Sequence, residues 1–169
     1  MTAISSRVLA DAEIHFRRLT FDERVKLADE VHARQPNLFF SVLALQLQEA
    51  TLKQMEVVLN ILLVYYTAMR LSGHKWPVIS EDDQERCLKR VTGRVRFLDG
   101  LTAQQQSQVI NEAITEHPEK PMLAYLYGTL RVNGYLGIDT EAQKMMMLVG
   151  LNMVECIAEA ASTKAKRKR

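Results

Sequence analysis

The longest uninterrupted apolar pattern in the chain covers residues 37–72. This stretch contains no Gly or Pro, and residues 57–69 within it are apolar except for Asn60 and Thr67. Such a segment is too hydrophobic for a helix with one wet face and too short and interrupted for a membrane span. We therefore expect no membrane span here, and we predict that residues 37–72 form the buried axis of a helical domain.

Apolar residues in the second half of this stretch recur at alternating steps of three and four, which is nearly a heptad pattern. The seam comprises Leu52, Met55, Leu59, Leu62, Tyr66 and Met69. It extends back to Leu38 and favours one continuous helix, in which Leu59 and Leu62 should be fully buried. The polar segment 48–54 offers an alternative, because Thr51 and Gln54 have the spacing of a capping box. In that case the chain forms a helical hairpin that turns near residues 50 and 51.

The remaining pattern is also helical. Thr20 and Glu23 form another capping box, and Pro36 ends the helix before it. Asn133 and Gly134 end a helix in our preferred interpretation, although the pair is also typical of a type I′ hairpin turn. We predict an all-α, single-domain bundle of six to eight helices around residues 37–72, covering residues 1–163. Further helices are expected over residues 3–18, 21–35, 81–98, 103–116, 122–132 and 141–161.

Charge is distributed unevenly. Residues 1–163 carry 17 Lys and Arg against 20 Asp and Glu, a net charge of −3, whereas residues 164–169 add five basic residues to reach the overall +2. The basic character therefore belongs to this short C-terminal segment, which we predict to be a disordered tail. On bulk charge, the body of the chain is not a basic nucleic-acid-binding domain.

The two cysteines, Cys87 and Cys156, are far apart in sequence and form no C-x-x-C motif. We interpret them as reduced thiols in the core of a cytoplasmic protein. Acidic residues Asp11 and Glu13 fall where a secretory signal would need an apolar run.

No motif in the chain carries catalytic chemistry of its own. Asp11 with His15, and Asp29 with His32, could each pair on one helix face, but neither pair has a serine or cysteine nucleophile nearby in sequence. The chain lacks H-E-x-x-H and any Glu-x-x-His. We therefore predict no catalytic residue, no metal ligand and no cofactor.

A basic ridge is the clearest local surface feature. Arg86, Arg90 and Arg94 are spaced i, i+4, i+8, which would align their guanidinium groups toward phosphates. The alternative is that these bases complement the dipole of a helix that begins with acids. The candidate polyanion contacts are Arg86, Lys89, Arg90, Arg94, Arg96, Lys164, Lys166, Arg167, Lys168 and Arg169.

Two further sets of residues are candidates for binding. Flexible thioethers suit a contact surface, and four of them gather on the last predicted helix: Met145, Met146, Met147 and Met153. A ligand pocket could be lined by the aromatic residues Tyr65, Tyr66, Trp76, Tyr125 and Tyr127.

These patterns favour a non-enzymatic helical module for protein–protein interaction that self-associates as a homodimer, through the last helix or the exposed flank of the central helix. A nucleic-acid-associated accessory protein, using the basic ridge and tail, is the first alternative. The second is a regulatory helical domain that binds a small ligand.

Overall fold

The computed structural model describes residues 2–167, with side chains described for residues 2–162. Within this part the predicted all-α fold is confirmed, because it contains eight α-helices, one 3-10 helix and no strand. In chain order the elements are α1 (Ser6–Arg18), α2 (Phe21–Arg34), α3 (Pro36–Leu43), η1 (Ala44–Gln48), α4 (Leu52–Leu71), α5 (Glu81–Leu98), α6 (Ala103–Glu116), α7 (Lys120–Val132) and α8 (Glu141–Arg167).

Local capping explains why most of the predicted boundaries agree with the structure. Four helices begin with a capping box, in which the N-cap side chain accepts a hydrogen bond from the backbone N–H of the third helical residue. The side chain of that third residue in turn accepts from the backbone N–H of the N-cap. The N-caps are Thr20, Thr51, Ser80 and Thr102. Each pair satisfies donors that a helix start leaves unbonded. Gly134 follows the end of α7 with a φ of 76°, so this pair terminates a helix and forms no hairpin.

The preferred prediction of one continuous helix over residues 37–72 is wrong. α3 tightens into η1, and Glu49 then adopts a left-handed φ of 59°. The hydroxyl of Thr51 accepts from the N–H of Gln54 (3.1 Å), and Gln54 Oε1 accepts from the N–H of Thr51 (2.9 Å). This capping box starts α4, so the alternative of a turn near residues 50 and 51 is the correct one.

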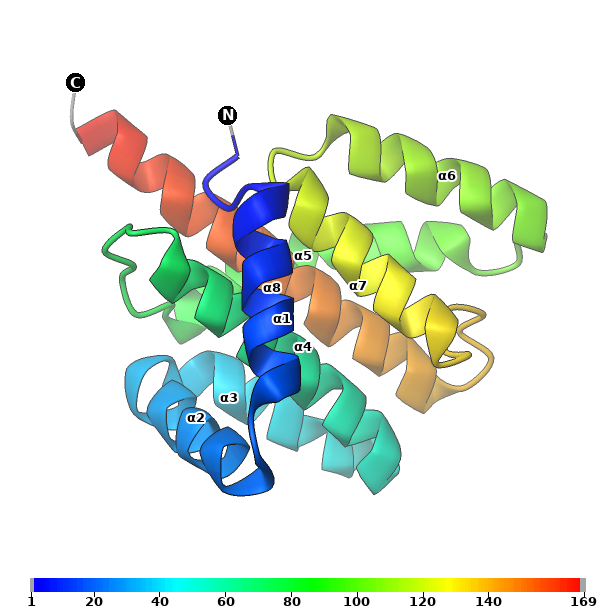
Figure 1. Ribbon diagram of the computed structural model, residues 1–169. Coiled ribbons are helices and arrows are strands. Elements are labelled where there is room, and N and C mark those ends of the chain that lie inside the picture. Colours follow the sequence, from blue (N-terminus) through cyan, green and yellow to red (C-terminus); the bar gives the residue numbers. More distant parts are fainter. Residues whose placement is uncertain (1, 168–169) are drawn as a thin grey trace.

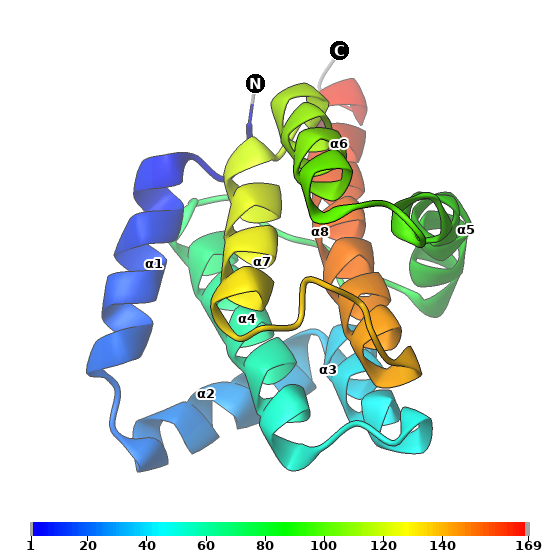
Figure 2. The same cartoon turned by 90° about the vertical axis from the view of Figure 1, so that its right-hand side faces the viewer.

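The helices form layers around two central ones, α4 and α8. Figure 2 shows α1 on one side, α4, α7 and α8 in the middle, and α5 on the other side. α2 and α3 close one end of the bundle, and α6 lies outside α7 at the other end (Figure 1). Because α4 and α8 are each covered by several helices, both can be apolar on nearly every side.

The core is therefore centred on two segments. Residues 61–69 of α4 are all buried, and so are residues 150–157 of α8. Leu62 is fully buried as predicted, whereas Leu59 is only partly buried. The sequence pattern predicted the first segment as the only central helix. The structure has two central helices, because α8 shares this position with α4.

The connector between α4 and α5 is held against the helices by hydrogen bonds of the Gln35 and Trp76 side chains. Gln35, at the start of α3, donates to the carbonyl of Pro77 (2.8 Å) and accepts from the N–H of Ile79 (2.9 Å). Trp76 donates through Nε1 to the carbonyl of Met69 (2.8 Å), which holds the loop against the end of α4. These bonds fix how α5 enters the bundle.

One helix in the described part of the chain is long and apolar enough to cross a membrane by length and composition. It is the segment Glu141–Ser162 of α8, with a mean hydropathy of 1.4 over its most apolar window. About half of that window is buried inside the chain (56%), which is the pattern of a core helix.

Candidate functional site

The predicted basic ridge packs against acidic residues of α8. Arg90 Nη2 lies 2.8 Å from Glu159 Oε2, Arg86 pairs with the same carboxylate, and Arg94 pairs with Glu155. Arg86 also contacts Asp83 on its own helix (2.6 Å). The three arginines thus meet three acids, and the described part of this cluster has no net charge.

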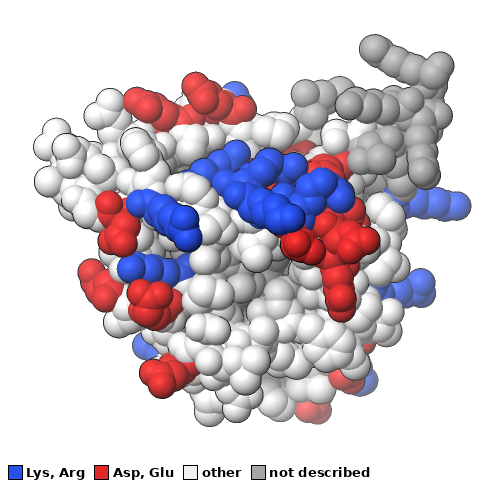
Figure 3. Space-filling model, turned by 180° about the vertical axis from the view of Figure 1, so that it is seen from behind, with Lys and Arg blue, Asp and Glu red and all other residues white. Residues whose placement is uncertain are grey.

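Figure 3 shows the molecule from the side opposite to that of Figure 1. On this side basic side chains form a band, with acidic side chains next to it. Lys89 is paired with Glu85 (3.2 Å), and Arg96 is exposed. A phosphate backbone would have to compete with Glu155 and Glu159 for the arginines. The backbone of α8 continues to Arg167, beyond the helix end at residue 161 that the sequence pattern predicted. Side chains of residues 163–169 lie outside the described part, so the contacts predicted for Lys164, Lys166, Arg167, Lys168 and Arg169 remain predictions.

Glu155 connects this cluster to a buried histidine. His117 Nε2 lies 3.0 Å from Glu155 Oε1, and His117 Nδ1 accepts from the N–H of Glu119 at 3.0 Å. Because Nδ1 is an acceptor, the ring proton is on Nε2 and is donated to Glu155. Burial alone would raise the pKa of Glu155, but hydrogen bonds from His117 and Arg94 outweigh it and lower the pKa to about 2.

The same loop binds the start of the chain. The buried carboxylate of Glu119 accepts from the backbone N–H groups of Ala3 (2.6 Å) and Ile4 (3.1 Å). Together with His117 and Glu155, it links the N-terminal segment, the loop between α6 and α7, and α8. Arg90, which lies 3.7 Å from Glu155, also donates to Cys87 Sγ (3.3 Å), but burial raises the pKa of that thiol. We therefore interpret this chain of hydrogen bonds as structural.

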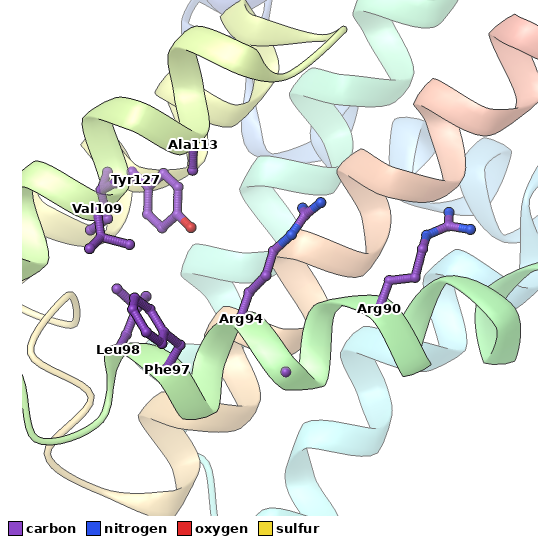
Figure 4. A pocket seen from close by; sticks show the side chains of 9 residues that line it. Arg90, Arg94, Phe97, Leu98, Val109, Ala113 and Tyr127 are labelled. Atoms are coloured by element: carbon purple, nitrogen blue, oxygen red, sulfur yellow. The ribbon is translucent and has the colours of Figure 1, made fainter.

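A cavity of about 330 Å³ lies between α5, α6 and α7, next to Arg94. Figure 4 shows Phe97 and Leu98 of α5 opposite Val109 of α6 and Tyr127 of α7, with Arg94 at one end. Its walls are mostly aliphatic or aromatic, and its size falls in the lower range of small-molecule sites. The full lining is Arg90, Gly93, Arg94, Phe97, Leu98, Val109, Ile110, Ala113 and Tyr127.

Tyr127 brings a polar atom to this cavity. Its side chain is only 4% exposed, and its hydroxyl points toward the end of the cavity where Arg94 lies (Figure 4). Within the described part of the chain, this hydroxyl makes no hydrogen bond. Burial raises the pKa of Tyr127 to about 12, so the hydroxyl keeps its proton at neutral pH and is a hydrogen-bond donor.

The five aromatic residues predicted to line one pocket lie in three places. Tyr127 lines the cavity just described, whereas Tyr66 and Trp76 line a separate groove near Arg70. Tyr65 is fully buried, donates to the carbonyl of Met122 (2.7 Å) and packs 6.0 Å from the Tyr125 ring. Aromatic composition identified candidates but could not group them, because they come from helices whose relative placement is a tertiary property.

Two helix-interior glycines give a direct test of local structure around the cavity. A Cβ added at Gly93 of α5 or Gly128 of α7 would meet no atom within 4 Å. Gly93→Ala and Gly128→Ala should each raise the free energy of unfolding by about 0.5–1 kcal/mol, because alanine loses less backbone entropy in a helix. Chemical denaturation checks this value.

The matched contrast is Gly150→Ala in α8. A Cβ at this position would overlap the side chain of buried Leu126 in α7, so here the same change should destabilise the protein. Stabilisation by all three substitutions would contradict the close approach of α7 and α8.

The methionines predicted to form a contact surface are mostly internal. Met146, Met147 and Met153 are buried in the core of the single chain, and Met145 is partly buried. They offer little surface to a partner. The apolar excess of the last helix is absorbed by α4, α5 and α7, which pack around it.

Exposed apolar side chains gather instead on α3 and η1. Phe40, Leu43 and Leu47 are 51%, 42% and 83% exposed, and their spacing places them on the outer side of this continuous helical stretch. We call these three residues the apolar ridge. His32 of α2 makes an edge-to-face contact with it, with its ring centroid 5.3 Å from that of Phe40.

The cysteines are core residues, as expected. Cys87 and Cys156 are both free and buried, and burial raises the pKa of each thiol. Neither is therefore activated as a nucleophile. Among the described residues, no group of three or more His, Cys, Asp or Glu side chains is placed to hold a metal ion.

Comparisons with family models, with curated proteins and with solved structures find no match for this chain. Its function must therefore be inferred from its own surfaces and cavity. Two features were not predicted from the sequence: the acidic partners of the three arginines, and the apolar ridge. Each has a signal in the sequence, because Glu155 and Glu159 repeat the i, i+4 spacing of the arginines and residues 36–48 contain no charge.

Proposed function

We propose that this protein is a helical protein–protein interaction module that forms a two-fold homodimer through the apolar ridge. The observation that carries the proposal is the exposure of Phe40, Leu43 and Leu47 on one face of α3 and η1. Large apolar side chains clustered on an outer face are typical of contact sites.

Charge supports a second copy of the chain as the partner. Residues 36–48 contain no Asp, Glu, Lys or Arg, and the part of Figure 3 below the basic band is largely uncharged. A two-fold contact places the same patch of both copies together, so a charge near the two-fold axis would face its own copy, a like charge. An uncharged helical face avoids this repulsion, and depletion of charge is characteristic of interface centres.

Replacing Leu47 with glutamate should separate the dimer. The wild type should sediment at about twice the 19.3 kDa mass of one chain, and Leu47→Glu should sediment as a monomer. An unpaired charge inside the contact should weaken dimerisation at least about a hundredfold. Analytical ultracentrifugation across micromolar concentrations measures both.

Val132→Glu is the matched control. Val132 is 87% exposed at the end of α7, so the same kind of charge is added outside the apolar ridge and the dimer should persist. A monomeric wild type would refute the proposal. So would a dimer that survives Leu47→Glu and is lost with Val132→Glu.

A nucleic-acid-associated function has less support. Phosphate binding needs basic side chains that can release their counterions, but Arg86, Arg90 and Arg94 already contact acids from two helices. A polyanion could bind these arginines only by breaking their ion pairs with Asp83, Glu155 and Glu159, which would reduce its affinity.

A further inference from the structure

We propose that the cavity between α5, α6 and α7 binds a small carboxylic acid with a compact aromatic body. The body would occupy the apolar space lined by Phe97, Leu98 and Val109, and the carboxylate would accept hydrogen bonds from Tyr127 and Arg94. This inference is independent of the proposed homodimer, because the apolar ridge lies on other helices.

The hydroxyl of Tyr127 is the first observation behind this assignment. The side chain is only 4% exposed, yet its hydroxyl makes no hydrogen bond within the described residues and is not among the buried polar atoms that lack a partner, so it is open to the cavity. It points into the end of the cavity where Arg94 lies (Figure 4). A ligand acceptor placed there would satisfy the donor.

Arg94 defines the charge of that acceptor. Its guanidinium has five N–H donors, and Glu155 is bonded through only one nitrogen, Nη1. The side chain is about half exposed and lines the cavity, and its Nε and Nη2 make no hydrogen bond within the described residues. A single carboxylate fits the donors that Arg94 keeps beside its bond to Glu155, whereas a phosphate with more charge would also need Arg90, which lines the cavity but is paired with Glu159.

Gly93 is the second observation. It interrupts the interior of α5 although alanine is a better helix former, and a Cβ there would meet no atom within 4 Å. Close packing against another helix therefore does not account for the glycine. It lines the cavity, so the missing side chain keeps the space on this side of the cavity open to a ligand.

The test is an amide NMR titration of the full chain with phenylacetate, with neutral 2-phenylethanol as the control probe. We expect saturable shifts at Gly93, Phe97 and Ile110, with a dissociation constant in the millimolar range for so small a probe. 2-Phenylethanol should bind at least about tenfold more weakly, because it lacks the charge that strengthens hydrogen bonds to Arg94.

Two variants locate the binding. Tyr127→Phe removes only the hydroxyl and should weaken phenylacetate binding about tenfold, with the melting temperature unchanged because the hydroxyl has no partner among the described residues. Gly93→Leu should abolish binding by filling the cavity. Gly128→Leu, a matched glycine replacement in α7 outside the cavity lining, should bind as the wild type does.

Each contrary result overturns the assignment. Absence of saturable shifts would show that the cavity does not take the acid. Equal affinity for 2-phenylethanol would remove the role of the carboxylate, and unchanged binding by Gly93→Leu would place the probe elsewhere on the protein.

Discussion

Leu62→Ala should lower the free energy of unfolding by about 2–5 kcal/mol, the usual range for large-to-small changes in a packed core. Leu62 is fully buried in α4, which packs against α1, α2, α3, α7 and α8. With neighbours on every side, the helices cannot collapse into the space that the missing atoms leave. Urea denaturation followed by circular dichroism measures the change.

Leu52→Ala on the same helix is the matched control. Leu52 is the first residue of α4 and is 84% exposed, so the same truncation should change stability by less than about 0.5 kcal/mol. A small effect at Leu62, or equal effects at both positions, would contradict the central position of α4.

Glu155→Gln should lower the free energy of unfolding by about 1–3 kcal/mol. The substitution keeps the shape of the side chain but removes the charge that His117 and Arg94 stabilise through hydrogen bonds. Glu159→Gln provides the comparison on the same helix. Its partners Arg86 and Arg90 are about half exposed, so its loss should cost less than about 1 kcal/mol.

The pH dependence of this difference tests the assignment. The pKa of Glu155 in the folded protein is about 2, below its usual value of 4.5. A carboxyl group with a lowered pKa contributes its stability in full above the usual value and loses it as the pH falls toward the folded value. The stability difference between wild type and Glu155→Gln should therefore shrink between about pH 5 and pH 2. A difference that is constant over this interval would contradict the assignment.

Glu155 also illustrates why the polyanion interpretation arose from the sequence. Spacing alone showed that Arg86, Arg90 and Arg94 share one face of a helix. It could not show that the same face packs on α8, where acids with the same spacing meet them. A helix pattern states which residues share a face, but the partner of that face is decided by how helices pack.

The sequence by itself determined the all-α class and most helix boundaries, because both depend on local interactions. Capping boxes such as Thr20 with Glu23, and breakers such as Pro36 and Gly134, act within a few residues. The break that was predicted wrongly, near Glu49, is also local. Two local signals disagreed there: the capping box at Thr51 predicted a new helix, whereas the apolar seam from Leu38 to Met69 predicted one continuous helix.

Only the tertiary structure decided which apolar surfaces are internal and which side chains meet. Met146 and Met147 look like contact residues in sequence but are buried by α8's neighbours, whereas Phe40 and Leu47 look like core residues and are exposed. The cavity beside Tyr127 likewise needs three helices brought together. The physical reason is that burial is a property of contacts between elements far apart in the chain, and periodicity within one element carries no information about its neighbours.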